Sequence, residues 1–118
     1  MGAADLGQLS RYWNCRLTTI GRNSGKPRTV TIWFALGDGV VYLTGSKDVP
    51  QWCRNLRVNG DVVLEIGGQR LKGRARVVDD EAQARDIRRR FVQRYLLARL
   101  SQPFGGYSRS VPVVVEIV

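Results

Sequence analysis

The chain has 118 residues, of which 19 are Lys or Arg, 10 are Asp or Glu, two are Cys and none is His. This length fits a single domain, here residues 1–118, with one hydrophobic core. The absence of His excludes Ser-His-Asp triads, imidazole acid–base catalysis and His-ligated metal sites. The formal net charge of +9 indicates an anionic partner, which leaves nucleic acid, an acidic membrane surface and a phosphorylated small molecule open.

The two cysteines, Cys15 and Cys53, do not form a CxxC motif, which argues against a thiolate zinc site or a dithiol redox centre. No apolar run reaches the roughly 18 to 20 residues that a transmembrane helix needs. The N-terminus also lacks the basic-then-apolar order of a secretory signal. We therefore expect a cytoplasmic protein with two reduced, buried thiols, without a transmembrane segment and without a metal.

Alternation of apolar and polar residues predicts strands in the first half of the chain. These strands are expected over residues 16–20, 28–36 and 40–44. The GRNSGKP segment, residues 21–27, has the Gly, Ser, Asn and Pro content of a loop. Asp38 and Gly39 form a tight turn between the last two of these strands, since Asp-Gly accepts the positive φ that such turns need. The first half is therefore expected to be antiparallel.

A change of period predicts a short helix over residues 46–59. Asp48 suits its N-cap, Pro50 its first turn and Gly60 its exit. Trp52 and Leu56 are four residues apart and lie on one face of this helix.

A second hairpin is expected over residues 61–66 and 69–78, around the turn Gly67-Gly68. In its second strand, apolar or small residues alternate with Arg70, Lys72, Arg74 and Arg76. A long helix follows from residue 79 to about 100, with a buried stripe of Ala84, Ile87, Phe91, Tyr95 and Ala98, and a last strand covers 111–118. Six strands and two helices indicate an α+β barrel or sandwich.

The basic loop is the first candidate binding feature. Its sequence from Gly21 to Lys26 is not a Walker A loop, because the glycines are too close, Pro27 replaces Ser or Thr, and a strand follows. Its glycine backbone and its cations would nevertheless suit a phosphate. A solvated basic loop is the equally weighted alternative. The cationic residues of the strand over 69–78 and the run Arg88-Arg89-Arg90 are expected to face solvent. The aromatic residues Trp33, Tyr42 and Trp52 either pack in the core or stack on a flat ligand.

The order of motifs resembles the deazaflavin-dependent nitroreductase family, within the split β-barrel, flavin-binding, pyridoxamine-phosphate-oxidase-like superfamily. One motif is T-x-G-R-x-[ST]-G-x-x-R, here from Thr19 to Arg28, and the other is W-x-x-N-L-x-x-N, here from Trp52 to Asn59. The resemblance covers about residues 15–118. It implies a split barrel of about six mainly antiparallel strands with one short and one long helix.

The resemblance implies coenzyme F420, with its phosphate and oligoglutamate tail, as the cofactor, and FMN as the alternative. Residues of the basic loop would hold the phosphate and the tail, the end of the third strand would line the ring or the phosphate, and the short helix would support the pocket. The cofactor-binding residues implied or suggested in this way are Arg22, Ser24, Gly25, Lys26, Arg28, Trp33, Thr44, Ser46, Lys47, Trp52 and Asn55. Asn23 stands where the family often has Lys, and Trp33 where it commonly has Tyr.

The implied reaction is hydride transfer from the reduced deazaflavin to a small acceptor such as a nitro compound, a quinone or an enone. The cofactor carries the hydride, so a chain without His need only position the two reactants and polarise the acceptor. We therefore expect no single indispensable acid or base. Tyr107, in the late loop, is a candidate proton donor. Split barrels commonly build their cofactor sites at a dimer interface, so a homodimer is expected.

Two other functions fit the same residues. A redox-silent protein that only carries the cofactor would have the same motifs, and a turnover assay would separate it from an enzyme. A basic barrel that binds single-stranded nucleic acid needs exposed aromatics among the cations, and the strand over 69–78 has none. We therefore expect a small-molecule substrate and no specific nucleic-acid partner.

Overall fold

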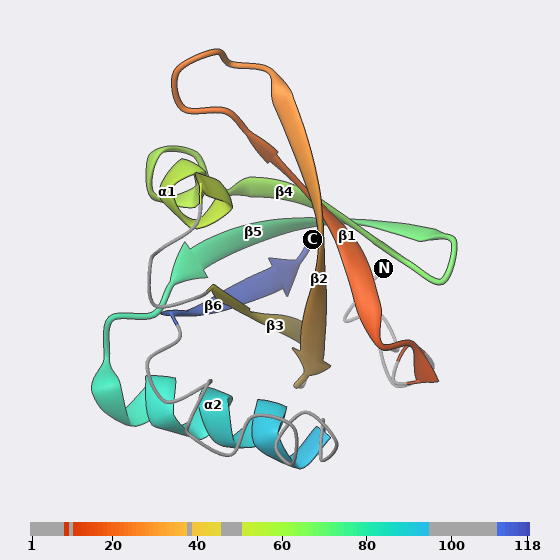
Figure 1. Cartoon of the computed structure of the whole chain (residues 1–118), viewed down its shortest axis with the longest axis vertical. Coiled ribbons are helices and arrows are strands. Elements are labelled where there is room, and N and C mark those ends of the chain that lie inside the picture. Colours follow the sequence, from red (N-terminus) through yellow and green to blue (C-terminus); the bar gives the residue numbers. More distant parts are fainter. Residues whose placement is uncertain (1–8, 10, 38, 46–50, 95–110) are drawn as a thin grey trace.

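The computed structural model describes residues 9, 11–37, 39–45, 51–94 and 111–118. Their strands and helices follow one another in the predicted order (Figure 1). In chain order they are β1 (Asn14–Ile20), β2 (Pro27–Leu36), β3 (Val40–Gly45), α1 (Gln51–Val58), β4 (Asp61–Ile66), β5 (Gln69–Val77), α2 (Glu81–Arg94) and β6 (Val111–Ile117).

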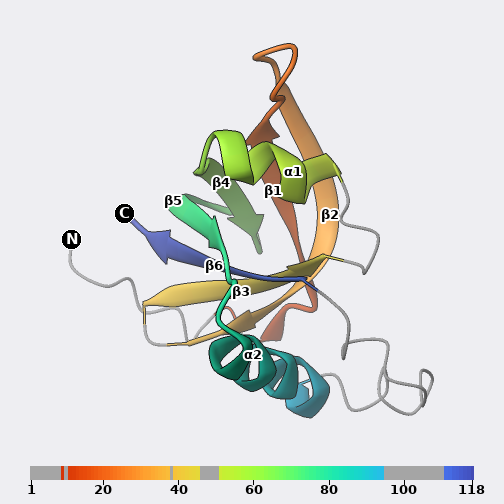
Figure 2. The ribbon, with the colours of Figure 1, turned by 90° about the vertical axis from the view of Figure 1, so that its left-hand side faces the viewer.

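The strands form a closed barrel in the order β1-β2-β3-β6-β5-β4, and every pair is antiparallel. The long strand β2 changes partner along its length: residues 27–33 pair with β1, whereas Phe34, Ala35 and Leu36 pair with β3. The first half of β2 and the end of β1 therefore project beyond the barrel as a hairpin arm next to α1 (Figures 1 and 2). The predicted α+β class and the barrel are confirmed.

The turns follow the local sequence. Gly39, Gly67 and Gly68 all have positive φ, as expected of the two tight hairpins. In β5, Gly73 and Ala75 are buried while the four cationic residues between and around them are exposed, which confirms the predicted alternation. Gly73 has no room for a side chain, because a Cβ there would lie 2.5 Å from Cγ1 of Val115.

The barrel interior holds the main core, whose fully buried members include Leu17, Phe34, Leu43, Leu64 and Val115. A second core lies outside the barrel, where Ala84, Ile87 and Phe91 of α2 pack on Ala35 of β2 and Val114 of β6. Strands β2 and β6 are therefore buried on both faces here. Alternation along β2 does not predict this second buried face, because it carries no information on the helix that covers it.

Several element boundaries differ from the sequence predictions. Strand β1 begins two residues earlier than predicted, and α1 is described only from Gln51. Residues 46–50 and the end of the predicted long helix, with Tyr95 and Ala98, lie outside the described residues. Arg88 is less exposed than expected, since its side chain is 18% accessible and pairs with Glu81 at 3.0 Å. No helix within the described ranges is long and apolar enough to cross a membrane.

Candidate functional site

The basic loop is closed by its own backbone. The N–H of Gly21 donates to the carbonyl of Lys26 at 2.8 Å, and the N–H of Gly25 donates back to the carbonyl of Gly21 at 2.9 Å. Gly25 has a φ of 70°, which a residue with a side chain rarely adopts. The Ser24 hydroxyl accepts the N–H of Lys26 at 3.1 Å. The loop is therefore a hydrogen-bonded turn at the tip of the hairpin arm.

A cleft of about 620 Å³ lies between this loop, the start of β2 and α1. Its lining contains two arginines, Arg22 and Arg28, together with neutral polar and apolar side chains, and no Asp or Glu of the described residues belongs to it. Trp52 is only 6% exposed and gives the helix side of the cleft an aromatic surface. The lining residues are Gly21, Arg22, Asn23, Ser24, Pro27, Arg28, Thr29, Val30, Gln51, Trp52 and Asn55.

Asn55 joins the helix to the loop. Its side-chain oxygen accepts the backbone N–H of Arg22 at 3.2 Å and Nη1 of the same arginine at 3.0 Å. Its Nδ2 donates to the hydroxyl of Thr19 at 3.3 Å. Asn55 is 4% exposed and Thr19 is fully buried. The guanidinium of Arg22 is therefore held at the wall of the cleft by a buried amide.

The cations of the loop differ in their neighbours from five of the other arginines that the structure describes. Within the described residues, no carboxylate forms an ion pair with Arg22, Lys26 or Arg28. Five other arginines, by contrast, each have a carboxylate partner within 4.0 Å. The loop therefore carries positive charge that no side chain of the described part of the chain neutralises.

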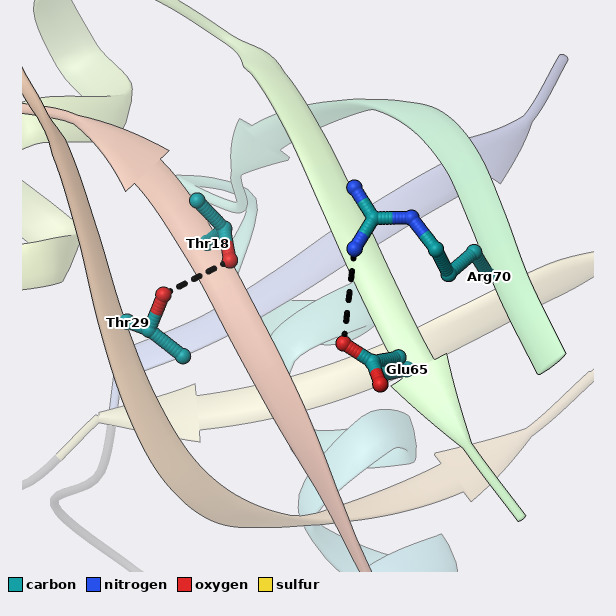
Figure 3. Close-up of polar contacts among 4 residues, drawn as sticks. All are labelled: Thr18, Thr29, Glu65 and Arg70. Atoms are coloured by element: carbon teal, nitrogen blue, oxygen red, sulfur yellow. Dashed lines mark hydrogen bonds and ion pairs between the residues drawn. The ribbon is translucent and has the colours of Figure 1, made fainter. Parts of the chain in front are cut away.

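Two of the four cationic residues of β5 pair with carboxylates of β4. Arg70 lies 3.5 Å from Glu65 and Arg74 lies 2.6 Å from Asp61 (Figure 3 shows the first pair). These exposed pairs are typical of a solvated sheet face. On the neighbouring strands, the Thr18 and Thr29 hydroxyls are 2.8 Å apart, which ties the base of the hairpin arm together across β1 and β2 (Figure 3).

The structure brings together five of the predicted site residues at the cleft: Arg22, Ser24, Arg28, Trp52 and Asn55. Gly25 and Lys26 belong to the same loop but do not line the cleft. Ser46 and Lys47 lie outside the described residues, as does the candidate proton donor Tyr107.

Trp33 and Thr44 do not line the cleft. Trp33 is 39% exposed, pairs with Asn14 of β1 and alternates with the buried Phe34, so it points out of the barrel. Thr44 is half-buried and pairs with Pro112 of β6. Tyr42, for which both core packing and stacking on a ligand were open, packs against the second core, beneath Arg90.

Sequence reasoning missed several residues of the cleft wall. Thr29, Val30 and Gln51 line it, although none was selected as a site residue. Thr29 and Val30 were assigned only to a strand, and their place beside the basic loop follows from the hairpin that β1 and β2 form. Thr19 had a signal, since it opens the loop motif; its buried hydroxyl supports Asn55.

Both cysteines are free and buried, as expected. Burial raises the pKa of the Cys15 thiol to about 12. Burial also raises the pKa of the Cys53 thiol to about 12, although the positive charge of Arg57 acts in the opposite direction. Neither thiol is a nucleophile at neutral pH, because the thiolate is the reactive form.

Comparison with known proteins agrees with this geometry. The chain is similar over 87% of its length to 93% of an F420-H2 dependent reductase (FDR-A), with 27% identity and a TM-score of 0.67. It is similar over 87% of its length to 79% of a chain described as a domain-swapped dimer, with 26% identity and a TM-score of 0.68. A FAD-binding protein from Mesorhizobium loti, at 17% identity, shares the fold over the whole chain and 91% of its own, with a TM-score of 0.71.

The family model for F420H(2)-dependent quinone reductase matches residues 4–117, which is nearly the whole chain. This match confirms the resemblance inferred from the loop and helix motifs. The chain belongs to the F420H2-dependent quinone reductase family, and is a deazaflavin-dependent oxidoreductase with coenzyme F420 as its cofactor.

Proposed function

We propose that the cleft between the basic loop and α1 holds the phosphate and acidic tail of F420, and that the protein transfers a hydride from the reduced cofactor to a small quinone, nitro compound or enone. One observation carries this proposal: the cleft wall presents Arg22 and Arg28, to which no carboxylate of the described residues is paired. Two unneutralised guanidinium groups suit phosphate and carboxylate oxygens, which they bind as forked donors.

The donor set of the loop fits such a ligand. The guanidinium groups supply charge, and the backbone at Gly25 is free of a side chain, with no atom within 4 Å of an added Cβ. Ser24 and Asn23 add neutral polar groups to the wall. We assign Arg22, Ser24, Gly25 and Arg28 to the anionic part of the cofactor, and Lys26, which does not line the cleft, to its long-range attraction.

Trp52 and Val30 give the cleft an apolar part beside its charged part. A flat ring system stacks well on an indole, and we assign Trp52 to the support of the cofactor. Thr44 lies near the end of β3, and Ser46 and Lys47 follow in the sequence between β3 and Gln51 of α1, which lines the cleft. We assign these three to the ring or the phosphate, whereas Trp33, on the outer face of β2, does not line the cleft and receives no role there.

F420 supplies the hydride, and the chain supplies position and electrostatics. The arginines hold the anionic end of the cofactor, and the polar groups of the wall stabilise negative charge that develops on the acceptor. The thiols do not take part, because burial keeps them protonated at neutral pH. We propose that water or a hydroxyl delivers the proton and that no side chain is an indispensable acid or base.

Titration with F420 and with FMN, followed by quenching of tryptophan fluorescence, tests the binding part of this proposal. We expect tighter binding of F420, because its tail adds carboxylates for the loop, and weaker binding at high salt. Oxidation of the reduced cofactor by menadione, a nitroimidazole and cyclohexenone then tests turnover and ranks the acceptor classes. FMN binding as tight as F420 binding at every salt concentration contradicts the cofactor assignment, and binding without turnover indicates a redox-silent carrier.

We also propose that the chain acts as one domain over residues 1–118, as a homodimer in the cytoplasm. A structural neighbour described as a domain-swapped dimer supports the dimer. The two free thiols support a reducing compartment. Glu65 and Asp61 of β4 argue against specific nucleic-acid binding along β5, because they pair with Arg70 and Arg74, two of its four cationic residues. Size-exclusion chromatography with light scattering measures the oligomeric state directly.

A further inference from the structure

The contact between Asn55 and Arg22 connects residues 33 positions apart in the sequence. Both groups that Arg22 directs at Asn55, its backbone N–H and its guanidinium Nη1, are donors under all conditions. The atom that faces them must therefore be the amide oxygen, and the amide nitrogen must face Thr19. The orientation of the amide follows from the chemistry of its partners.

We propose that Asn55 is a positioning residue that acts through Arg22, and that its neutrality is the property that matters: the amide fixes the guanidinium without cancelling its charge. The identity of the anion that Arg22 meets rests on the proposed function. The role of Asn55 toward any anion in the cleft does not.

A carboxylate at the same position would hold Arg22 at least as firmly. An Asp side chain has the shape of Asn, keeps the oxygen that faces Arg22, and can accept the Thr19 hydroxyl as a donor. It would also form a charge-assisted pair with the guanidinium, at the 3.0 Å that separates Nη1 from the Asn55 oxygen. The net positive charge that an incoming anion meets at the wall of the cleft would then fall by one unit. Partial burial limits the screening of this change by salt.

The chain offers a matched control just after the end of α1. Asn59 stands four residues after Asn55, and its side-chain oxygen accepts the N–H of Asp61 at 2.9 Å. It does not line the cleft. Asn59→Asp preserves this acceptor and adds the same negative charge to the chain, but not at Arg22. A difference between the two Asn→Asp variants therefore reports on position and not on net charge.

The experiment compares the wild type with Asn55→Asp and Asn59→Asp. Affinity is measured for F420 and, independently, for inorganic pyrophosphate, by isothermal titration at low and at physiological salt. Thermal unfolding of each variant is recorded beside it. We expect Asn55→Asp to unfold near the wild-type temperature, to bind both ligands about tenfold to a hundredfold more weakly, and to show a shallower dependence of affinity on salt. Asn59→Asp should stay within about threefold of the wild type.

A second variant keeps the proposal testable where Asn55→Asp does not fold. Asn55→Ser releases Arg22 without adding charge, and it is combined with Arg22→Ala in a double-mutant cycle. We expect Asn55→Ser to weaken pyrophosphate binding several-fold in the wild-type background and to have no further effect once Arg22 is absent. Equal effects in both backgrounds would overturn the positioning role.

The outcomes separate this inference from the proposed function. Weaker pyrophosphate binding by Asn55→Asp alone supports the inference, whether or not F420 binds. A wild-type protein that binds pyrophosphate and not F420 contradicts the proposed function only. A folded Asn55→Asp protein with wild-type affinity and salt dependence overturns the inference, and so does a wild-type protein that binds neither ligand.

Discussion

Arg28 and Lys26 belong to one basic segment, but only Arg28 lines the cleft. This difference allows a paired test of the anion site. If the Arg28 guanidinium binds the phosphate or the tail of F420 directly, Arg28→Ala removes a charge-assisted hydrogen bond worth about 1.5 to 3 kcal/mol. The dissociation constant for F420 should then rise by about tenfold to about 150-fold.

Lys26→Ala removes the same unit charge from the same loop. Its long-range attraction is screened over about 8 Å at physiological ionic strength, so affinity should change by no more than about threefold. Both side chains are exposed, and neither forms an ion pair within the described residues, so each substitution should leave the free energy of unfolding within about 0.5 kcal/mol. The effect on binding can therefore be read without a correction for folding.

The assay is fluorescence titration with F420, using the quenching of the tryptophans, of which Trp52 lines the cleft. Arg28→Lys is the third variant and should recover only part of the affinity, because a lysine cannot act as a forked donor. Arg28→Ala and Lys26→Ala with equal affinities would refute the reasoning from the cleft lining. Wild-type affinity in both would show that the loop is merely a solvated basic turn.

Four further predictions concern the thiols and the two cores. Cys15 and Cys53 should react with a thiol reagent at pH 8 only as the protein unfolds. Cys→Ala at both positions should leave the single-turnover rate of hydride transfer within about threefold of the wild type. A fast reaction of the native protein with the reagent, or a loss of turnover, would contradict the conclusion that the thiols are inert. The folded pKa of both thiols, about 12, exceeds the unfolded value of 9.0, so the unfolded state loses its thiol protons first as the pH rises. The free energy of unfolding should therefore fall by up to about 2 kcal/mol per thiol between about pH 9 and 10.5. Urea titrations of the double alanine variant should lack this loss. Gly73→Ala should lower the free energy of unfolding by about 1 to 3 kcal/mol, since its Cβ would lie 2.5 Å from Val115 Cγ1, and a neutral effect in urea unfolding would show that the barrel interior can adjust. Phe91→Ala should lower the free energy of unfolding by about 3 to 5 kcal/mol in the same measurement. It should leave the F420 affinity of the folded protein unchanged, because α2 packs far from the basic loop and α1 (Figure 1). A parallel loss of affinity would show coupling between the second core and the cleft.

The local sequence determined the elements and their order. The Gly67-Gly68 turn and the alternation along residues 69–77 predict a hairpin without reference to the rest of the chain, because turn conformation and side-chain direction are set over a few residues. The basic loop was likewise visible as a motif, with Arg22 and Arg28 in fixed spacing. Family membership followed from the order of such short segments and agrees with the family match over residues 4–117.

Only the tertiary structure decided which faces are buried and which side chains meet. Ala35 belongs to a core because α2 covers the outer face of β2, and Trp33, two positions before it, points out of the barrel away from the cleft. The amide of Asn55 reaches Arg22 because α1 packs beside the hairpin arm, a contact that no local pattern encodes. The charge of the basic loop was decided in the same way: the fold brings no carboxylate of the described residues to Arg22 or Arg28, whereas the pairs between β4 and β5 already follow from the register of the local hairpin.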